Sequence, residues 1–284
     1  MKSSQLVIKM VLDETTLNPL TEKPLMRFLS LIRLCLAAFS FVSFYSCNEK
    51  EEFNSEALED YLPLNEDKYI IYRVDSTLFT NFGAVTEIHS YQEKHVIDTI
   101  ITDNLGRTSY RVFVYQRDSA GTQTWQPRNS STYYITPLPD QVEQVDENNF
   151  RFIKMHLPLR DGYSWKGNKY LPTTQGGPYA SKFNFSNDDN MPDWDYYYDG
   201  PPSSFSYQNM NYTDVYTVEE ADEAYNVPIT DPNAYAAKSR AVERYSKNIG
   251  LIFRQFEMWE YQPNPGGVPY KTGFGVTMWM IDHN

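Results

Sequence analysis

The chain contains few residues of the kinds that catalytic and metal sites use. Among its 284 residues are two cysteines, Cys35 and Cys47, and both lie in the first fifth of the sequence. The rest of the chain therefore has no disulfide, no cysteine-ligated zinc and no thiolate nucleophile. Neither a G-x-S-x-G nor an H-E-x-x-H motif occurs, which excludes the usual signatures of serine hydrolases and zinc proteases.

Histidine is also scarce, with four in the chain. His89 and His95 are six residues apart, and in one regular strand this spacing separates them by about 20 Å. That distance is too long for one metal ion, so we interpret the histidines as structural or solvated groups. Carboxylates are plentiful, and a hydrolase that uses a pair of Asp or Glu residues is an alternative that the sequence does not decide.

Acidic residues outnumber basic ones: the chain has 37 Asp and Glu residues and 25 Lys and Arg residues, so its formal net charge is −12. Affinity for phosphate backbones and anionic headgroups depends on Lys and Arg. We therefore expect no nucleic-acid partner. Aromatic residues make up 15% of the chain and include 23 tyrosines, a composition typical of β-strands and of partly wet binding surfaces.

The N-terminal region has the residue order of a secretion signal. From Met26 the chain reads MRFLSLIRLCLAAFSFVSFYSC, with Arg27 and Arg33 ahead of an uncharged run at residues 34–45. The run is too short to span a bilayer, which takes about 20 apolar residues, and it has the length of a signal-peptide core. Residues 1–25 do not resemble a signal, so we expect Met26 to be the true start. A soluble protein with a buried apolar N-terminal helix is the alternative.

The end of this run, Ser46 and Cys47, resembles a bacterial lipoprotein signal, in which a cysteine after a small residue is acylated and the bond before it is cleaved. The resemblance implies a signal peptide at residues 26–46 and a mature chain that begins at lipidated Cys47. The following Lys50, Glu51 and Glu52 resemble the signal that directs lipoproteins of the Bacteroidota to the outer face of the outer membrane. We therefore expect attachment to the membrane through a lipid anchor and display at the cell surface.

The rest of the chain divides into a tether and a β-rich domain. Residues 47–60 are polar and acidic, and we expect a flexible tether there. Residues 61–284 show alternating strand patterns separated by turn signals such as DNLG at residues 103–106. Strands are predicted at residues 68–79, 84–102, 107–118, 131–137, 150–157, 234–244, 249–261 and 271–281. At residues 234–244 the alanines favour a helix as the alternative, whereas the following turn favours a strand. The short turns leave no room for crossover helices, so the pattern predicts an antiparallel curved sheet, sandwich or open barrel.

This domain resembles a group of uncharacterised cell-envelope lipoproteins of the Bacteroidota in four segments. They are YLPLNEDKYIIYRVD, LPLRDGYSW, RYSKNIGLIFRQFEMWEY and the terminal DHN. The resemblance covers residues 61–284. It implies a β-rich domain at the cell envelope and no particular activity.

One segment, residues 176–212, interrupts the strand pattern with glycine, proline, acids and aromatic residues. We predict a long loop that forms the interaction surface, because loops carried on a rigid sheet concentrate binding residues. The aromatic candidates for stacking on sugar rings are Trp194, Tyr196, Tyr197 and Tyr198, and the acidic candidates for binding hydroxyl groups or calcium are Asp193, Asp195 and Asp199. The alternatives are a solvated acidic loop and aromatic residues that pack down on the sheet.

These observations predict an outer-membrane lipoprotein that acts as a non-enzymatic binding or structural module. Its partner would be a glycan or another envelope protein, and calcium is the one cofactor that the pattern suggests. The alternative is a carbohydrate-active or other hydrolase that uses Asp or Glu. A deep pocket with two facing carboxylates would favour the hydrolase, and a shallow aromatic surface would favour the binding module.

The first testable consequence concerns Cys47. Cys47→Ala removes the thiol that would be acylated, so the protein should leave the membrane fraction of fractionated cells. Cys35→Ala is the matched control, because that residue lies inside the predicted signal, and it should leave the distribution unchanged. Unchanged retention of the Cys47→Ala protein in washed membranes would contradict attachment through Cys47.

Overall fold

Thirteen β-strands form one antiparallel sheet in this computed structural model, which describes residues 56–171 and 191–284. The described residues belong to one compact unit, Ser55–Asn284. Its elements are α2 (Leu58–Tyr61), β1 (Tyr69–Thr80), β2 (Val85–Thr102), β3 (Thr108–Asp118), β4 (Gln126–Pro137), β5 (Gln141–Val145), β6 (Arg151–His156), β7 (Ser164–Lys166), the 3₁₀ turn η1 (Met191–Asp193), β8 (Asp195–Tyr198), β9 (Ser203–Tyr207), β10 (Met210–Tyr225), β11 (Ala236–Ser246), β12 (Gly250–Gln262) and β13 (Tyr270–His283).

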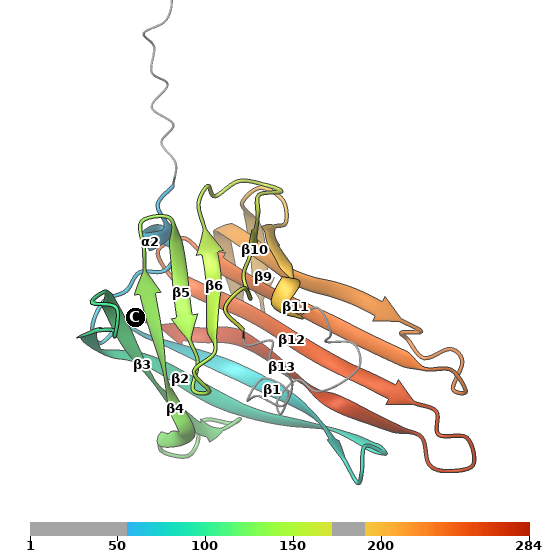
Figure 1. The fold of residues 1–284 in the computed structure, drawn as a ribbon. Coiled ribbons are helices and arrows are strands. Elements are labelled where there is room, and N and C mark those ends of the chain that lie inside the picture. Colours follow the sequence, from blue (N-terminus) through green and yellow to red (C-terminus); the bar gives the residue numbers. More distant parts are fainter. Residues whose placement is uncertain (1–55, 172–190) are drawn as a thin grey trace, which may run out of the picture. The chain divides into compact units, whose positions relative to one another are not determined.

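The sheet curves into a nearly closed barrel with one unsealed seam (Figure 1). Along the sheet the strands follow the order β6-β5-β4-β3-β2-β1-β13-β12-β11-β10-β8-β7, and β9 pairs with β10 beside this path. The prediction of an antiparallel β domain is therefore confirmed. Among the described residues, no helix has the length and apolar character needed to cross a membrane.

The long hairpins lie where alternation and turn residues predicted them. The strands predicted at residues 68–79, 84–102 and 107–118 correspond to β1, β2 and β3, with ladders that pair neighbours residue by residue. At the turn after β2, the Asp103 side chain accepts hydrogen bonds from the backbone N–H groups of Leu105 and Arg107 at 2.8 and 2.9 Å. An acid at this position caps the turn with its own side chain, as such turns require.

The first and last strands of the sheet are neighbours, because β1 pairs antiparallel with β13. The last residue completes this contact: the Asn284 side chain accepts from the backbone N–H of Tyr69 at 2.7 Å and donates to the carbonyl of Asp67 at 3.0 Å. The two predicted C-terminal strands are thus confirmed as β12 and β13, and the first and last strands of the described residues meet in the middle of the sheet order.

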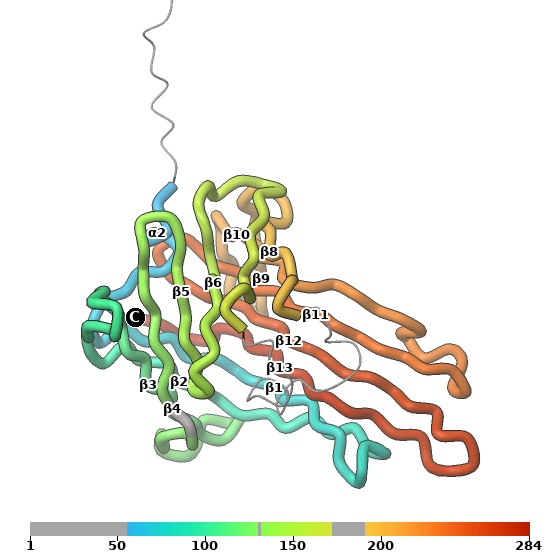
Figure 2. Tube along the Cα trace, viewed as in Figure 1, coloured from blue at the N-terminus to red at the C-terminus, as the bar shows by residue number. Residues whose placement is uncertain are grey.

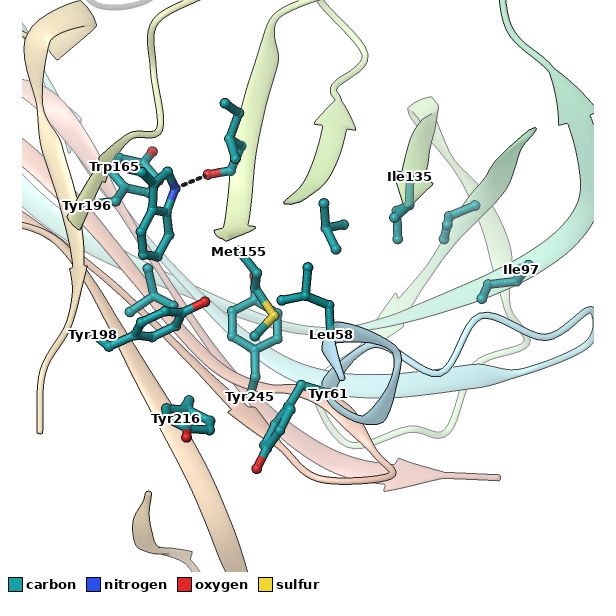
Figure 3. Packing of buried hydrophobic residues seen from close by; sticks show 14 residues of the cluster. Leu58, Tyr61, Ile97, Ile135, Met155, Trp165, Tyr196, Tyr198, Tyr216 and Tyr245 are labelled. Atoms are coloured by element: carbon teal, nitrogen blue, oxygen red, sulfur yellow. Dashed lines mark hydrogen bonds between the residues drawn. The ribbon is translucent and has the colours of Figure 1, made fainter. Parts of the chain in front are cut away.

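The barrel is filled at one end by apolar residues and by helix α2 (Figure 3). Leu58 and Tyr61 of α2 are buried there. The Tyr61 ring meets the Tyr216 ring edge-on, with 5.0 Å between centroids. Residues 56–60, which the composition assigned to the tether, are thus described as part of the compact unit, whereas residues 47–55 lie outside the described residues.

The seam lies between β6 and β7, the two ends of the sheet order. In place of a ladder, the backbone N–H of Ile153 donates to the carbonyl of Gly167 at 2.8 Å. The indole N–H of Trp165 donates to the carbonyl of Ile153 at 2.9 Å (Figure 3). One backbone hydrogen bond and one side-chain hydrogen bond therefore join the two edges where the ladder stops.

Candidate functional site: a charged cavity inside the barrel

The barrel encloses a cavity of about 280 Å³ with an unusual lining. Strands from most of the barrel contribute to it, and the lining combines aromatic, charged and aliphatic side chains. Its aromatic residues are Tyr91, Tyr133, Phe152, Tyr196, Phe256 and Phe274, and its charged residues are Glu93, Arg128, Asp146, Glu147, Lys154, Glu220 and Arg254. Charged side chains are almost never buried without partners, so the pairing of these groups decides what the cavity can bind.

A β-bulge directs Lys154 into the cavity. The register between β5 and β6 passes from Val142 opposite Met155 to Glu143 opposite Ile153, which leaves Lys154 as the extra residue. A bulge of this kind re-aims a side chain that regular alternation would point elsewhere. Lys154 is consequently buried although it sits on an edge strand.

A second bulge does the same for Glu220 on β10. There the register passes from Glu219 opposite Val242 to Ala221 opposite Ala241, so Glu220 has no partner in the β11 ladder. The two bulged residues meet inside the barrel, where Lys154 Nζ lies 2.6 Å from Glu220 Oε1. Two irregularities that lie 66 residues apart in sequence thus create one buried ion pair.

Glu243 on β11 is the second carboxylate of this cluster. Its Oε1 atom lies 2.8 Å from Lys154 Nζ and 3.3 Å from Arg254 Nε, and its Oε2 accepts from the hydroxyl of Tyr245 at 2.5 Å. We call Lys154, Glu220, Glu243 and Arg254 the interior charge cluster. Each of its carboxylates is buried and each has a cation within hydrogen-bonding distance.

The two carboxylates differ in how readily they hold a proton. Burial raises the pKa of Glu220 above its usual range, and Lys154 only partly offsets this effect. Burial acts on Glu243 in the same way, but the charges of Lys154 and Arg254 and the hydrogen bonds from Lys154 and Tyr245 outweigh it, so the pKa of Glu243 is lowered. The cluster therefore concentrates negative charge on Glu243 rather than on Glu220.

Glu93 on β2 is another of the acids that face this cavity. Its carboxylate lies 3.1 Å from His95 Nε2 and 3.3 Å from Arg128 Nη1. Burial would raise the pKa of Glu93, but His95, Arg128 and Arg254 outweigh burial and lower it. Arg254 thus interacts with acids of both β2 and β11, and it connects Glu93 to the interior charge cluster.

An apolar compartment of about 70 Å³ lies beside the charged one, toward α2. Leu62, Leu64 and Leu251 are among the aliphatic residues that line it. The two compartments have four lining residues in common, His95, Tyr133, Gln144 and Lys154. A ligand that spans both would meet aliphatic side chains at one end and charged groups at the other.

The aromatic segment that we predicted as an exposed loop is placed differently, which is a correction. Residues 195–198 form strand β8, and the Tyr196 and Tyr198 side chains are 1% and 0% exposed. Their hydroxyls donate to Asn168 Oδ1 at 2.7 Å and to the His156 carbonyl at 2.8 Å. Tyr197 points outward and Trp194 packs partly against the core. The four rings therefore do not form one stacking platform, because alternation in a strand sends neighbours to opposite faces.

The acidic candidates are exposed, and two of them lie near a lysine. Asp195 pairs with Lys166 at 3.0 Å, and Lys166 also donates to the backbone carbonyl of Asp193 at 2.5 Å. At Asp199 the backbone N–H donates to the Thr217 carbonyl. Within residues 56–171 and 191–284, no three His, Cys, Asp or Glu side chains are grouped so that they could hold a metal ion. Calcium binding stays a prediction, and Cys47, Lys50, Glu51 and Glu52 lie outside the described residues.

Sequence reasoning missed the interior charge cluster. The signal that could have shown it is a charged residue between apolar neighbours in a strand, as in RFIKMH around Lys154 and AVERYS around Glu243. Such a residue either faces solvent or is paired inside, and alternation alone does not distinguish the two cases. Only the register of the finished sheet does.

No protein-family profile matches the chain, and no curated protein matches it in sequence. Distantly similar solved structures include a Bacteroides fragilis protein described as exported and as having a YmcC-like fold, at 10% identity and a TM-score of 0.33, over 77% of this chain and 97% of that one. An outer-membrane lipoprotein-sorting protein domain from Vibrio parahaemolyticus matches at 9% identity and a TM-score of 0.20, over 80% and 89%. These similarities assign the chain to no family.

Removal of the cluster's central cation should destabilise the fold. Lys154→Met keeps an unbranched apolar stem but leaves two buried carboxylates without their nearest cation, so the free energy of unfolding of residues 55–284 should fall by about 3–5 kcal/mol. Lys166→Met is the matched control, because it breaks an exposed pair worth at most about 1 kcal/mol. Urea unfolding followed by circular dichroism measures both. Equal losses in the two variants would contradict a structural role for the cluster.

The opposite pKa shifts of Glu220 and Glu243 should give opposite pH dependences. A carboxyl group whose pKa is lowered by folding stabilises the fold at pH values above its pKa in the unfolded chain, which is about 4.3 for Glu. The loss in free energy of unfolding that Glu243→Gln shows relative to wild type should therefore shrink as the pH falls below about 4. A carboxyl group whose pKa is raised by folding destabilises the fold while it is charged, and this penalty disappears as it is protonated. The free energy of unfolding of wild type should therefore rise relative to that of Glu220→Gln as the pH falls from 7 toward about 4. Urea unfolding at several pH values measures both differences in free energy. If the two differences change in the same direction as the pH falls, the opposite pKa shifts of Glu220 and Glu243 are refuted.

Proposed function

We propose that this protein is a cell-envelope lipoprotein, attached through Cys47, whose barrel binds a small amphipathic molecule in its interior without converting it. The signal-like order of residues 26–47 supports the attachment. The observation that carries the binding function is the interior cavity, in which an apolar compartment adjoins a charged and aromatic one. Ligand sites are commonly concave, largely apolar and equipped with a few placed polar groups.

The lining indicates the chemical class of the ligand. Arg128 and Arg254 both line the cavity and both interact with Glu93. Burial disfavours negative charge on Glu220, so Lys154 and Arg254 share one charged carboxylate within the interior charge cluster, that of Glu243. A ligand with one anionic group would complete the balance, because guanidinium groups bind carboxylates and phosphates in a planar, bidentate manner. Its apolar or aromatic body would contact Phe152, Phe256 and Phe274.

The state of the carboxylates supports binding over hydrolysis. Glu93 and Glu220 face one deep cavity, the arrangement that a hydrolase would show. However, Lys154 lies 2.6 Å from Glu220, and His95 and Arg128 lie 3.1 and 3.3 Å from Glu93. A general acid and a general base both need to be free to exchange a proton with the substrate. These acids instead serve as partners for buried cations.

Two fluorescent probes that differ in one group test this proposal. 1-Anilinonaphthalene-8-sulfonate carries a sulfonate that N-phenyl-1-naphthylamine lacks, and residues 55–284 should bind the sulfonated probe at least tenfold more tightly. Arg254→Met should reduce affinity for the sulfonate probe about tenfold, in the range of a charged hydrogen bond, and leave the neutral probe unchanged. Arg73→Met, which removes a partly exposed arginine paired with Asp75, is the matched control.

The position of the probe needs its own control. Val276 lines the cavity, and Val276→Trp should fill it and abolish saturable binding of both probes. Leu105→Trp adds the same side chain at a site that is 70% exposed, and it should change neither affinity. Undiminished binding in a folded Val276→Trp protein would place the probe elsewhere and overturn the proposal.

A further inference from the structure

Three hairpin turns lie together at the end of the barrel away from α2 (Figures 1 and 2). They connect β1 to β2, β12 to β13 and β10 to β11. These six strands are consecutive in the sheet, in the order β2-β1-β13-β12-β11-β10, and each pairs antiparallel with its neighbour. The turns therefore share one edge, with about 10 Å between neighbouring turns. We call this edge the turn surface.

Large apolar side chains project from each turn. Phe82 between β1 and β2 is 98% exposed, Val268 between β12 and β13 is 66% exposed, and Tyr225 at the end of β10 is 62% exposed. Val85 and Tyr270 beside them are also exposed. Single exposed apolar residues are ordinary on protein surfaces, but a group on one edge marks an interaction site.

Two of these turns also lack charge. No Asp, Glu, Lys or Arg occurs in residues 79–86 or 261–270, although 22% of all residues are charged and the net charge is −12. The turn between β10 and β11 carries one acidic residue, the exposed Asp231. Exposed turns ordinarily carry charged residues, which are rarely buried, so the turn surface is apolar and carries little charge.

The turns are held in place rather than loosely attached. The backbone N–H of Lys271 donates to the Gly83 carbonyl at 2.8 Å, which ties the first turn to β13. The ammonium of Lys271 lies 4.3 Å from the centre of the Trp259 ring. Phe82 has a φ of +57°, a left-handed conformation that a bulky side chain adopts only at some cost. The backbone therefore displays Phe82 outward at a position where glycine would be the ordinary choice.

We propose that the turn surface inserts into the interface of a lipid bilayer with uncharged headgroups. Separate projecting aromatic and aliphatic residues are suited to the boundary between headgroups and acyl chains. A protein partner would be expected to meet arginine and a pocketed anchor, and the turns offer neither. An anionic bilayer would be repelled by the net charge of −12. Insertion therefore depends on apolar contact and not on charge.

This contact is separate from the predicted lipid anchor and from the cavity ligand. The described chain enters the barrel at α2, at the opposite end of β12 from the turn surface. The 13 residues of β12 span roughly 40 Å at about 3.3 Å each. Residues 48–55 reach at most about 29 Å when fully extended. The barrel would therefore touch a bilayer at two points when its long strands lie along the membrane.

Co-sedimentation of residues 55–284 with phosphatidylcholine vesicles tests the proposal without any lipid anchor. Wild type should sediment with the vesicles, and its binding should be unchanged between 50 and 500 mM NaCl. The variant Phe82→Ser with Val268→Ser should bind at least tenfold more weakly. Ile100→Ser with Leu105→Ser removes comparably exposed apolar side chains at the other end of the barrel and should bind as wild type does.

Four results would overturn the proposal: no sedimentation of wild type, equal binding by the turn variant, equal loss in the control, or binding that disappears at high salt. Oligomers of wild type that the turn variant does not form, seen by sedimentation velocity, would assign the surface to a second copy of the chain instead. The turn variant should keep the affinity of wild type for 1-anilinonaphthalene-8-sulfonate, so failure of the cavity proposal and failure of this one are distinguished.

Discussion

A single buried ammonium group joins the two ends of this sheet. Lys154 lies on β6, at one end of the strand order, and its partners Glu220 and Glu243 lie on β10 and β11, near the other end. Removing three charges from water is costly, and the cost is offset only where each charge finds close partners of opposite sign. The barrel supplies those partners by curving until β6 faces β10. The curvature that forms the barrel is therefore also what brings Lys154 within hydrogen-bonding distance of both carboxylates.

The molecule reverses the usual distribution of polarity in two places. Its interior holds Lys154, Arg254 and three glutamates where a β-barrel of this size would hold aliphatic layers. Its turn surface exposes Phe82 and Val268 where charged residues are expected. Both reversals lower stability relative to an ordinary barrel, and departures of this kind are typical of functional regions. The two regions use different forces, since the cavity offers charge and the turn surface offers apolar area.

Much of the fold could be predicted from the sequence because its long strands show their period over many residues. β2 has 18 residues and β12 has 13, and both carry the alternation that a half-buried strand requires. The four residues of β8 are too few to show the alternation of a strand. The glycine, proline and acidic residues around them are typical of loops, and the sequence therefore predicted a loop there. The interior charge cluster could not be predicted, because a bulge shifts the register by one residue. Which residue is displaced depends on a partner strand that is distant in sequence.

The pairing of β1 with β13 sets the order in which this protein can reach its final state. One neighbour of β1 follows it directly in the chain, but the other is the last strand, about 200 residues later. The sheet therefore stays divided into two halves until β13 has been synthesised. Contacts of such long range also form slowly. Until then the edges of β1 and β12 are unpaired, and an unpaired edge is a place where a strand of another chain can add to the sheet.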